Sequence, residues 1–301
     1  MPRADLTALF EMLRSAPRVD SIAEQRAQLE LFAPFINANP PPVGSVESGV
    51  RISADVTADV IVPPGAPPFP TLLYLHGGGW SIGSPNSHAK LARQLCAGAG
   101  AVVVNVDYRL APEHPFPVPL EDCVTAARWT RANVQRHGGD PHRLAIGGDS
   151  AGANLSAAVI NELRDEISFR AALLIYGAFD MATSWRDYDR YAPEEDPVLP
   201  KYIMKMMIDA YLSGGAATDD PRVSPLFADL RHFPPSCFIV GAIDPLFGES
   251  VSMRDTLQTL GCECEFHRYA EMPHAFLQFD LPEAAQGIDA ASRFLRRHLG
   301  G

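Results

Sequence analysis

Short apolar runs alternate with amphipathic segments along most of the chain. The runs at 72–75, 101–106 and 171–176 consist almost wholly of apolar residues and have the length of buried strands. Between them, segments such as 86–98 and 118–136 carry apolar residues at helical spacing. Strands that alternate with helices predict an α/β fold, with a parallel sheet covered by helices on both faces.

The alternation is interrupted once, in the second half of the chain. Residues 180–230 contain prolines, acidic residues and one helical run at 202–212. The pattern then resumes with a strand at 237–242 and ends with a strand at 264–269 and a helix over about 283–299. We therefore interpret 180–230 as an insertion into the sheet fold.

The N-terminal region follows a different pattern. Residues 1–48 are predicted to be mainly helical, because their leucines and phenylalanines recur at helical spacing. Residues 50–62 alternate apolar and polar positions and predict a strand. We expect the N-terminal helices to pack against the insertion and to form a cap with it.

Charge and composition indicate which classes of binding partner are not expected for this chain. The chain has 301 residues, of which 47% are hydrophobic, with 25 basic and 36 acidic side chains and a net charge of −11. This negative charge disfavours nucleic acid and anionic membrane surfaces as partners. No apolar run approaches the length of a membrane span, and the N-terminus shows no signal-peptide core, so a cytoplasmic location is expected.

Cysteine usage agrees with that expectation. The five cysteines are an odd number, and most of them lie in apolar helix or strand patterns. They lack zinc-ligand partners at the usual spacing, so we expect free thiols in a reducing compartment and neither disulfides nor a metal site.

The segment Gly148–Gly152 reads GDSAG and lies between a short apolar run and a helical pattern. Ser150 would therefore occupy a nucleophile elbow, a strained strand-to-helix turn that exposes its hydroxyl at the carboxyl end of the strand. Small neighbours are needed there because strand and helix approach closely. The N–H of Ala151 at the helix N-terminus points the same way and is placed to meet a developing oxyanion.

A second motif, His76-Gly77-Gly78-Gly79-Trp80, directly follows the apolar run at 72–75. Three consecutive glycines let backbone N–H groups turn toward a ligand without side chains in the way. The pattern is typical of the oxyanion-hole loop of lipases and esterases. A phosphate-binding loop is disfavoured, because the lysine and the serine or threonine of a P-loop are missing.

Ser150, Asp244 and His274 follow one another in the order nucleophile, acid, base. Asp244 and His274 each come after a predicted strand, and ligands of parallel sheets bind beyond the carboxyl ends of strands. The histidine would remove the serine proton, and the carboxylate would hold its tautomer. Asp149 and Glu249 are the rival carboxylates; we expect Asp149 to point away and Glu249 to begin a helix. Five other histidines are expected to be solvated: His88, His137, His142, His232 and His298.

These segments resemble the hormone-sensitive-lipase-like family of α/β-hydrolases, in the bacterial esterase branch with a GDSAG elbow. The matching segments are HGGGW at 76–80, VDYRLAPEHPFP at 106–117, GGDSAGANL at 147–155, DPL at 244–246 and the Pro273-His274 loop. The resemblance implies an α/β-hydrolase fold, with a mostly parallel eight-stranded sheet. It also implies a helical cap formed by 1–48 and 180–230 on a catalytic domain formed by 49–179 and 231–301.

The resemblance also assigns roles within the site. It implies a Ser-His-Asp triad of Ser150, His274 and Asp244. It implies an oxyanion hole made by the N–H groups of Gly78, Gly79 and Ala151, with His76 and Gly77 supporting the glycine loop. One position departs from the family pattern: Gly248 stands where a second acid is usual, which puts the support of Asp244 in question.

The predicted activity is hydrolysis of short- to medium-chain acyl esters through an acyl-enzyme, without a metal or cofactor. The insertion helix carries Met204, Met207 and Ile208, and we hypothesise that one face of this helix lines the acyl pocket. Ordinary packing of the cap on the core is the alternative interpretation of these residues. Trp80 and Asp149 are further candidates for the lining of the substrate pocket.

Other activities stay open on the sequence alone. The same triad could serve an amidase, a lactonase or a deacetylase, and a non-catalytic receptor is a remote alternative because all three triad residues are present. The chain could be a monomer or a homodimer that pairs through the sheet edge at 264–269.

Overall fold

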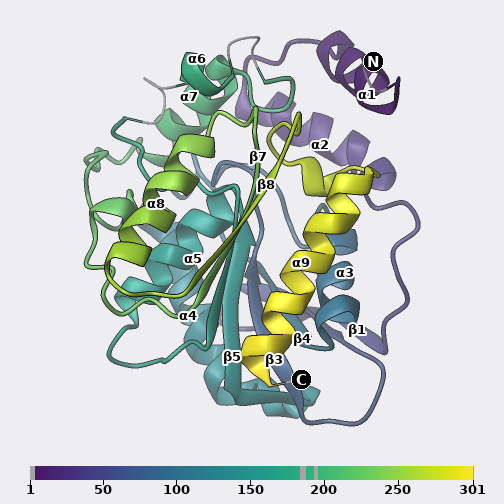
Figure 1. Ribbon diagram of the computed structural model, residues 1–301, viewed down its shortest axis with the longest axis vertical. Coiled ribbons are helices and arrows are strands. Elements are labelled where there is room, and N and C mark those ends of the chain that lie inside the picture. Colours follow the sequence, from purple (N-terminus) through teal and green to yellow (C-terminus); the bar gives the residue numbers. More distant parts are fainter. Residues whose placement is uncertain (1–3, 184–187, 193–195, 301) are drawn as a thin grey trace.

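One mixed sheet forms the centre of the molecule (Figure 1). The computed structural model describes residues 4–183, 188–192 and 196–300. Eight strands are hydrogen-bonded in the order β1-β2-β4-β3-β5-β6-β7-β8. They are β1 (Ser45–Arg51), β2 (Thr57–Val62), β3 (Phe69–Leu75), β4 (Val102–Asp107), β5 (Gly139–Asp149), β6 (Ala171–Ile175), β7 (Ser236–Gly241) and β8 (Cys264–Tyr269). The strands from β4 to β8 in this order are parallel, and β2 is antiparallel to both of its neighbours.

Helices cover both faces of this sheet, which confirms the predicted α/β-hydrolase architecture. The helices are α1 (Ala4–Ser15), α2 (Ile22–Ile36), α3 (Ala89–Ala99), α4 (Val118–Asn133), α5 (Ala151–Glu162), α6 (Tyr188–Tyr191), α7 (Lys201–Tyr211), α8 (Phe247–Thr259) and α9 (Pro282–Leu299). Short 3-10 turns span Val134–His137, Pro225–Phe227 and Phe276–Gln278. One apolar cluster joins α3 and α9 to one face, and a second joins α4, α5 and α8 to the other.

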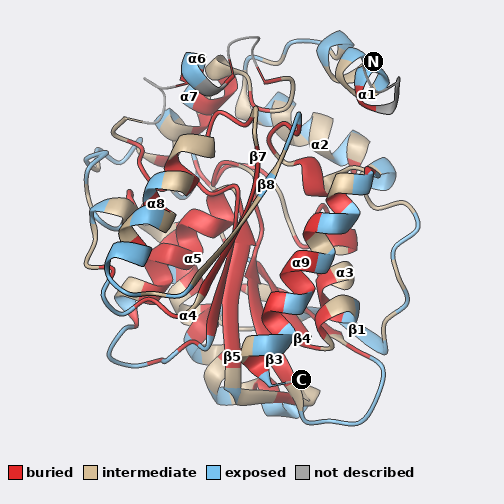
Figure 2. Cartoon of the chain, in the orientation of Figure 1, coloured by how far each residue is buried: buried red, intermediate tan, exposed pale blue. Residues whose placement is uncertain are grey.

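Burial is greatest in the middle of the sheet and in α5 (Figure 2). Every residue of α5 from Ala151 to Ile160 is buried, and most of them are alanine, glycine or serine. Such small side chains let the helix lie close against the sheet, which the tight turn before it requires.

The predicted strand over 50–62 is wrong in its middle. The chain leaves β1 at Arg51, turns, and enters β2 at Thr57 as an antiparallel hairpin. The N–H groups of Ile52 and Ser53 both donate to the carbonyl of Val56, which closes the turn. Apolar residues continue to alternate through this turn, so the two-residue period does not reveal it.

The N-terminal helices lie at the same end of the molecule as the inserted segment with α6 and α7 (Figure 1). Residues 45–48, which the sequence placed with the N-terminal cap, instead begin β1, and the first three of them pair with β2. Among the described ranges, no helix has both the length and the apolar character that crossing a membrane would need.

Parallel strands place their carboxyl ends at one edge of the sheet. The loops that follow β3, β5, β7 and β8 therefore meet there, and they carry the glycine motif and the three residues of the predicted triad. This edge is where the candidate site lies.

Candidate active site

The backbone at Ser150 is strained, as the elbow motif predicts. Ser150 has φ = 55° and ψ = −119° between β5 and α5, a conformation that costs a non-glycine residue about 1–3 kcal/mol. Its N–H donates to the carbonyl of Ile175 at 2.8 Å, which ties the turn to β6. A side chain at Gly148 or Gly152 would overlap the carbonyl of Leu75, so both positions require glycine.

Ser150, His274 and Asp244 are joined by two hydrogen bonds. His274 Nε2 lies 2.9 Å from Ser150 Oγ, and His274 Nδ1 lies 2.9 Å from Asp244 Oδ2. The other carboxylate oxygen of Asp244 accepts the N–H of Leu246 at 2.8 Å. Asp244 is fully buried and His274 nearly so. The structure therefore brings together the three residues that the sequence selected by their order and by their positions after predicted strands.

The surroundings of His274 favour its protonated form. Burial lowers the pKa of the imidazole, but the charge and hydrogen bond of Asp244 raise it, and the net effect is a pKa above the ordinary 6.5. An imidazolium that forms during proton transfer is thus stabilised where it arises.

Glu249, the second rival carboxylate, serves a neighbouring loop. Its Oε2 accepts the N–H groups of Phe179 at 2.5 Å and Asp180 at 2.7 Å. It lies in the first turn of α8, as expected from the sequence. Asp244 has its own hydrogen bonds to His274 and Leu246, so its orientation does not require an acid at position 248.

The glycine loop contributes two N–H groups beside the serine, and the first residue of α5, Ala151, contributes a third. Gly78 and Gly79 have φ values of 120° and 55°, which side-chain-bearing residues rarely adopt. Within the part of the chain that the structure describes, no hydrogen bond is donated by the N–H of Gly78, Gly79 or Ala151. A side chain at Gly79 would overlap Met207, so α7 packs directly on this loop.

His76 supports the loop from within the core. Its Nδ1 lies 2.8 Å from the carbonyl of Gly77, and its ring stacks on Tyr108 at 4.3 Å. The hydroxyl of Tyr108 donates to the carbonyl of His76 at 2.7 Å. Burial, with the nearby charge of His88, lowers the pKa of His76 to about 3, so this ring stays neutral.

Asp149 is hydrogen-bonded to the glycine loop and not to His274. Its Oδ1 accepts the N–H of Gly77 at 2.9 Å and the hydroxyl of Tyr74 at 2.6 Å. Its Oδ2 lies 3.4 Å from Nε2 of His88. Burial raises the pKa of Asp149, but the charge and hydrogen bond of His88 and the other donors outweigh it and lower the pKa to about 2.

His88 is therefore not solvated, contrary to the sequence expectation. Its side chain is 4% exposed, and its Nδ1 lies 2.9 Å from Ser87 Oγ while its Nε2 lies 2.7 Å from Gln278 Nε2. The polar residues around His88 in the sequence suggested a surface position, but its side chain is buried at the start of α3, where it contacts Asp149. Only the tertiary contact reveals this residue.

Two cavities open beside Ser150. The larger, of about 230 Å3, is lined by both N-terminal helices, the segment 197–199, Met207 and Asp149. The smaller, of about 30 Å3, is lined by residues that include Trp80, Met204, Met207 and Ile208. All five residues of the hypothesised pocket thus lie on the wall of one cavity or of both.

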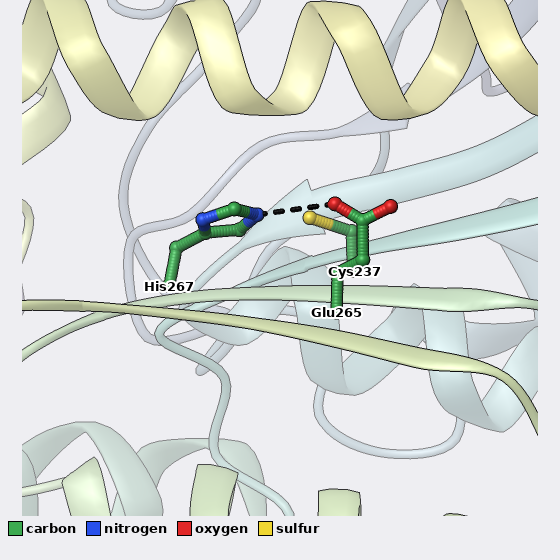
Figure 3. Close-up of side chains that lie close together, drawn as sticks. All are labelled: Cys237, Glu265 and His267. Carbon is green, nitrogen blue, oxygen red and sulfur yellow. Dashed lines mark hydrogen bonds and ion pairs between the residues drawn. The ribbon is translucent and has the colours of Figure 1, made fainter.

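A cluster of possible metal donors lies elsewhere on the sheet (Figure 3). Cys237 of β7 and Glu265 and His267 of β8 place one donor atom each within 4.8 Å of one another. Glu265 already lies 3.2 Å from His267 and also pairs with Arg297, and burial raises the pKa of the Cys237 thiol. A second such group contains Glu263, Glu265 and His298. Neither group of the described residues includes a member of the triad.

Comparisons with known proteins agree with this geometry. The α/β-hydrolase fold family matches residues 72–278. The chain is 33% identical to the carboxylesterase NlhH of Mycobacterium tuberculosis over 77% of this chain and 74% of that protein. It is 35% identical to an acetyl-hydrolase of Streptomyces hygroscopicus, with 76% of each chain covered. A crystal structure of an esterase from the bacterial hormone-sensitive lipase family superposes with a TM-score of 0.86 and 33% identity over all of both chains.

Proposed function

The chain belongs to the hormone-sensitive-lipase family of α/β-hydrolases and is a carboxylesterase, and we propose that Ser150, His274 and Asp244 carry out the hydrolysis. The observation that carries this assignment is the pair of 2.9 Å contacts that link the serine, the histidine and the aspartate. Both lie within the range that proton transfer and orientation of a base require.

The reaction follows from these contacts. His274 Nε2 takes the proton of Ser150 while Oγ attacks the ester carbonyl, and Asp244 stabilises the imidazolium. The N–H groups of Gly78, Gly79 and Ala151 hold the tetrahedral oxyanion. His274 then gives its proton to the departing alcohol, and water repeats the cycle on the acyl-enzyme. The proposed steps use only these three side chains, the three N–H groups and water.

The two cavities suggest where the acyl and alcohol parts of an ester substrate bind. In the proposal the acyl group enters the smaller cavity, under Trp80, Met204 and Met207, and the alcohol part lies in the larger one. The smaller cavity has a volume of about 30 Å3 and the larger one about 230 Å3, which supports a preference for short acyl chains. Medium chains would be accommodated by movement of the flexible methionine side chains.

The cap is part of the same proposal. The helices α1 and α2 and the insertion at 180–230 together form a wall of the larger cavity, which supports a cap assembled from two distant parts of the chain. The remaining residues, from β1 to β6 and from β7 onward, would form the catalytic domain.

Hydrolysis of p-nitrophenyl esters from acetate to palmitate, with wild type and Ser150→Ala in parallel, tests the assignment. We expect turnover to peak at short acyl chains and to vanish in the variant. A peak at long chains would place the acyl group in the larger cavity instead. Turnover that survives Ser150→Ala would refute the assigned nucleophile.

Location and assembly are further parts of the proposal. All five cysteines are free thiols, which supports a reducing compartment such as the cytoplasm. The strand β8 is an edge of the sheet, so a second copy could pair along it. Fractionation of the source cells and light scattering of the purified protein test these two points, and a strictly monomeric mass would reject pairing along β8.

A further inference from the structure

The carboxylate of Asp196 joins two parts of the site that are far apart in sequence. Asp196 lies in the insertion ahead of α7 and is 2% exposed. Its Oδ2 accepts the backbone N–H of His274 at 2.8 Å. Its Oδ1 accepts the N–H groups of Val198 and Leu199, each at 2.8 Å. One side chain therefore holds both the loop of the histidine and the turn that leads into α7.

The turn held by Asp196 is a wall of the substrate cavities. Residues 197–199 line the larger cavity, and Leu199 also lines the smaller one. Tyr188 holds the same turn from α6, because its hydroxyl donates to the carbonyl of Leu199 at 2.8 Å and accepts the N–H of Asp196 at 3.1 Å. The segment that would contact substrate is thus connected through one carboxylate to the backbone of the base.

Asp196 also adds charge beside the imidazole. The groups that face His274 are Ser150 at Nε2, Asp244 at Nδ1, the ring of Tyr176 at 5.0 Å, and the carboxylates of Asp149 and Asp196. Burial raises the pKa of Asp196 and the charge of Asp244 raises it further, while the charge of Asp196 in turn raises the pKa of His274. Three accepted N–H bonds satisfy the carboxylate in this buried place.

Given the proposed serine-hydrolase function, we propose that Asp196 is a positioning residue, which couples the seating of segment 196–199 over the cavity to the alignment of His274 with Ser150. Proton transfer needs the Nε2–Oγ distance to stay within hydrogen-bond range, so a shift of the His274 backbone would slow the reaction. A substrate that displaces the segment would disturb the base through the same carboxylate.

Replacement of Asp196 separates its charge from its geometry. Asp196→Asn removes the negative charge. It also leaves a single side-chain oxygen to accept either the N–H of His274 or the N–H groups of Val198 and Leu199. We expect kcat to fall by about tenfold or more, as for one lost charge-assisted hydrogen bond. The acid limb of the kcat/KM profile should move to lower pH, because a negative charge beside His274 is gone. Asp196→Glu keeps the charge but displaces it, so kcat should fall while the acid limb stays in place.

Asp180 provides a matched control from the same insertion. It is also a buried aspartate, but its carboxylate accepts hydrogen bonds from Ala182 and Thr183 and makes none with His274. Asp180→Asn should leave the acid limb of the pH profile where it is in wild type. Circular dichroism of each variant verifies that it is folded.

A second variant tests the coupling without changing any charge. Tyr188→Phe frees the carbonyl of Leu199 and should lower kcat with the acid limb unchanged, even if Asp196→Asn does not fold. The proposal is overturned if Asp196→Asn keeps the kcat and the acid limb of wild type, or if Tyr188→Phe keeps the kcat of wild type. Failure of the serine-hydrolase function is distinguishable, because wild type would then be inactive or Ser150→Ala would be active.

Discussion

Replacing Asn154 with leucine should both destabilise the protein and loosen the oxyanion loop. Asn154 is fully buried in α5, four residues after the nucleophile. Its Oδ1 accepts the indole N–H of Trp80 at 3.2 Å, and its Nδ2 donates to the carbonyls of Ala178 at 2.7 Å and Val223 at 2.9 Å. One amide thus connects the glycine loop, the loop after β6 and the insertion.

The magnitude follows from the three partners that lose their hydrogen bonds. A buried group left unpaired costs about 1–3 kcal/mol, so three of them cost about 3–9 kcal/mol. Burial of the leucine side chain offsets about 1.5–3 kcal/mol of this. Taking the middle of each range, we therefore expect a net loss of about 4 kcal/mol, a large part of the roughly 5–15 kcal/mol that stabilises a folded domain.

Thermal unfolding followed by circular dichroism measures this loss. The entropy of unfolding for a chain of this length is about 0.6 kcal/mol/K, so the midpoint should fall by about 6–7 °C. Ester turnover well below the midpoint should also fall, because Trp80 directly follows the glycine loop and loses its connection to α5.

Asn161, one of the later residues of α5, is the matched control. Neither side-chain polar atom of Asn161 has a hydrogen-bond partner among the described residues. Asn161→Leu makes the same chemical change without removing a partner, so its midpoint should equal or exceed that of wild type. Equal losses from the two replacements would refute the reasoning, because they would show that helix propensity or packing sets the cost.

Three further predictions concern activity. The kcat/KM for a p-nitrophenyl ester should fall as pH decreases through a value above 6.5, because the pKa of His274 is raised and only the neutral imidazole accepts a proton; a midpoint below 6.5 would contradict this. Met207→Ala should shift the preferred acyl chain toward longer esters and Met207→Trp toward acetate, and an unchanged chain-length profile would exclude this residue from the acyl pocket. Asp149→Ala should lower kcat by about 10- to 100-fold, because Gly77 and Tyr74 lose their acceptor, whereas Asp149→Asn keeps an oxygen and should lose less; similar losses in both would point to charge instead.

Local sequence determined the parts of the site that depend on backbone conformation. The elbow around Ser150 needs small residues on a strained turn, and the loop at Gly78 and Gly79 needs positive φ. Both requirements are met by residues that are adjacent in the sequence, so each motif can be recognised without the structure. The alternation of apolar runs with helical segments likewise predicted the parallel sheet and the edge at which Asp244 and His274 would meet.

The tertiary structure alone decided which side chains support these elements. His88 and Asp196 both lie in polar surroundings in the sequence, yet both are buried, because their partners Asp149 and His274 lie on distant segments. The pattern of apolar and polar residues predicts which face of a segment is buried. It does not predict which hydrogen-bond donor of one segment will meet which acceptor of another. The contact of His88 with Asp149 joins residues 61 positions apart, and that of Asp196 with His274 joins residues 78 positions apart. These contacts support the oxyanion loop and the base, and they become visible only once the chain is folded.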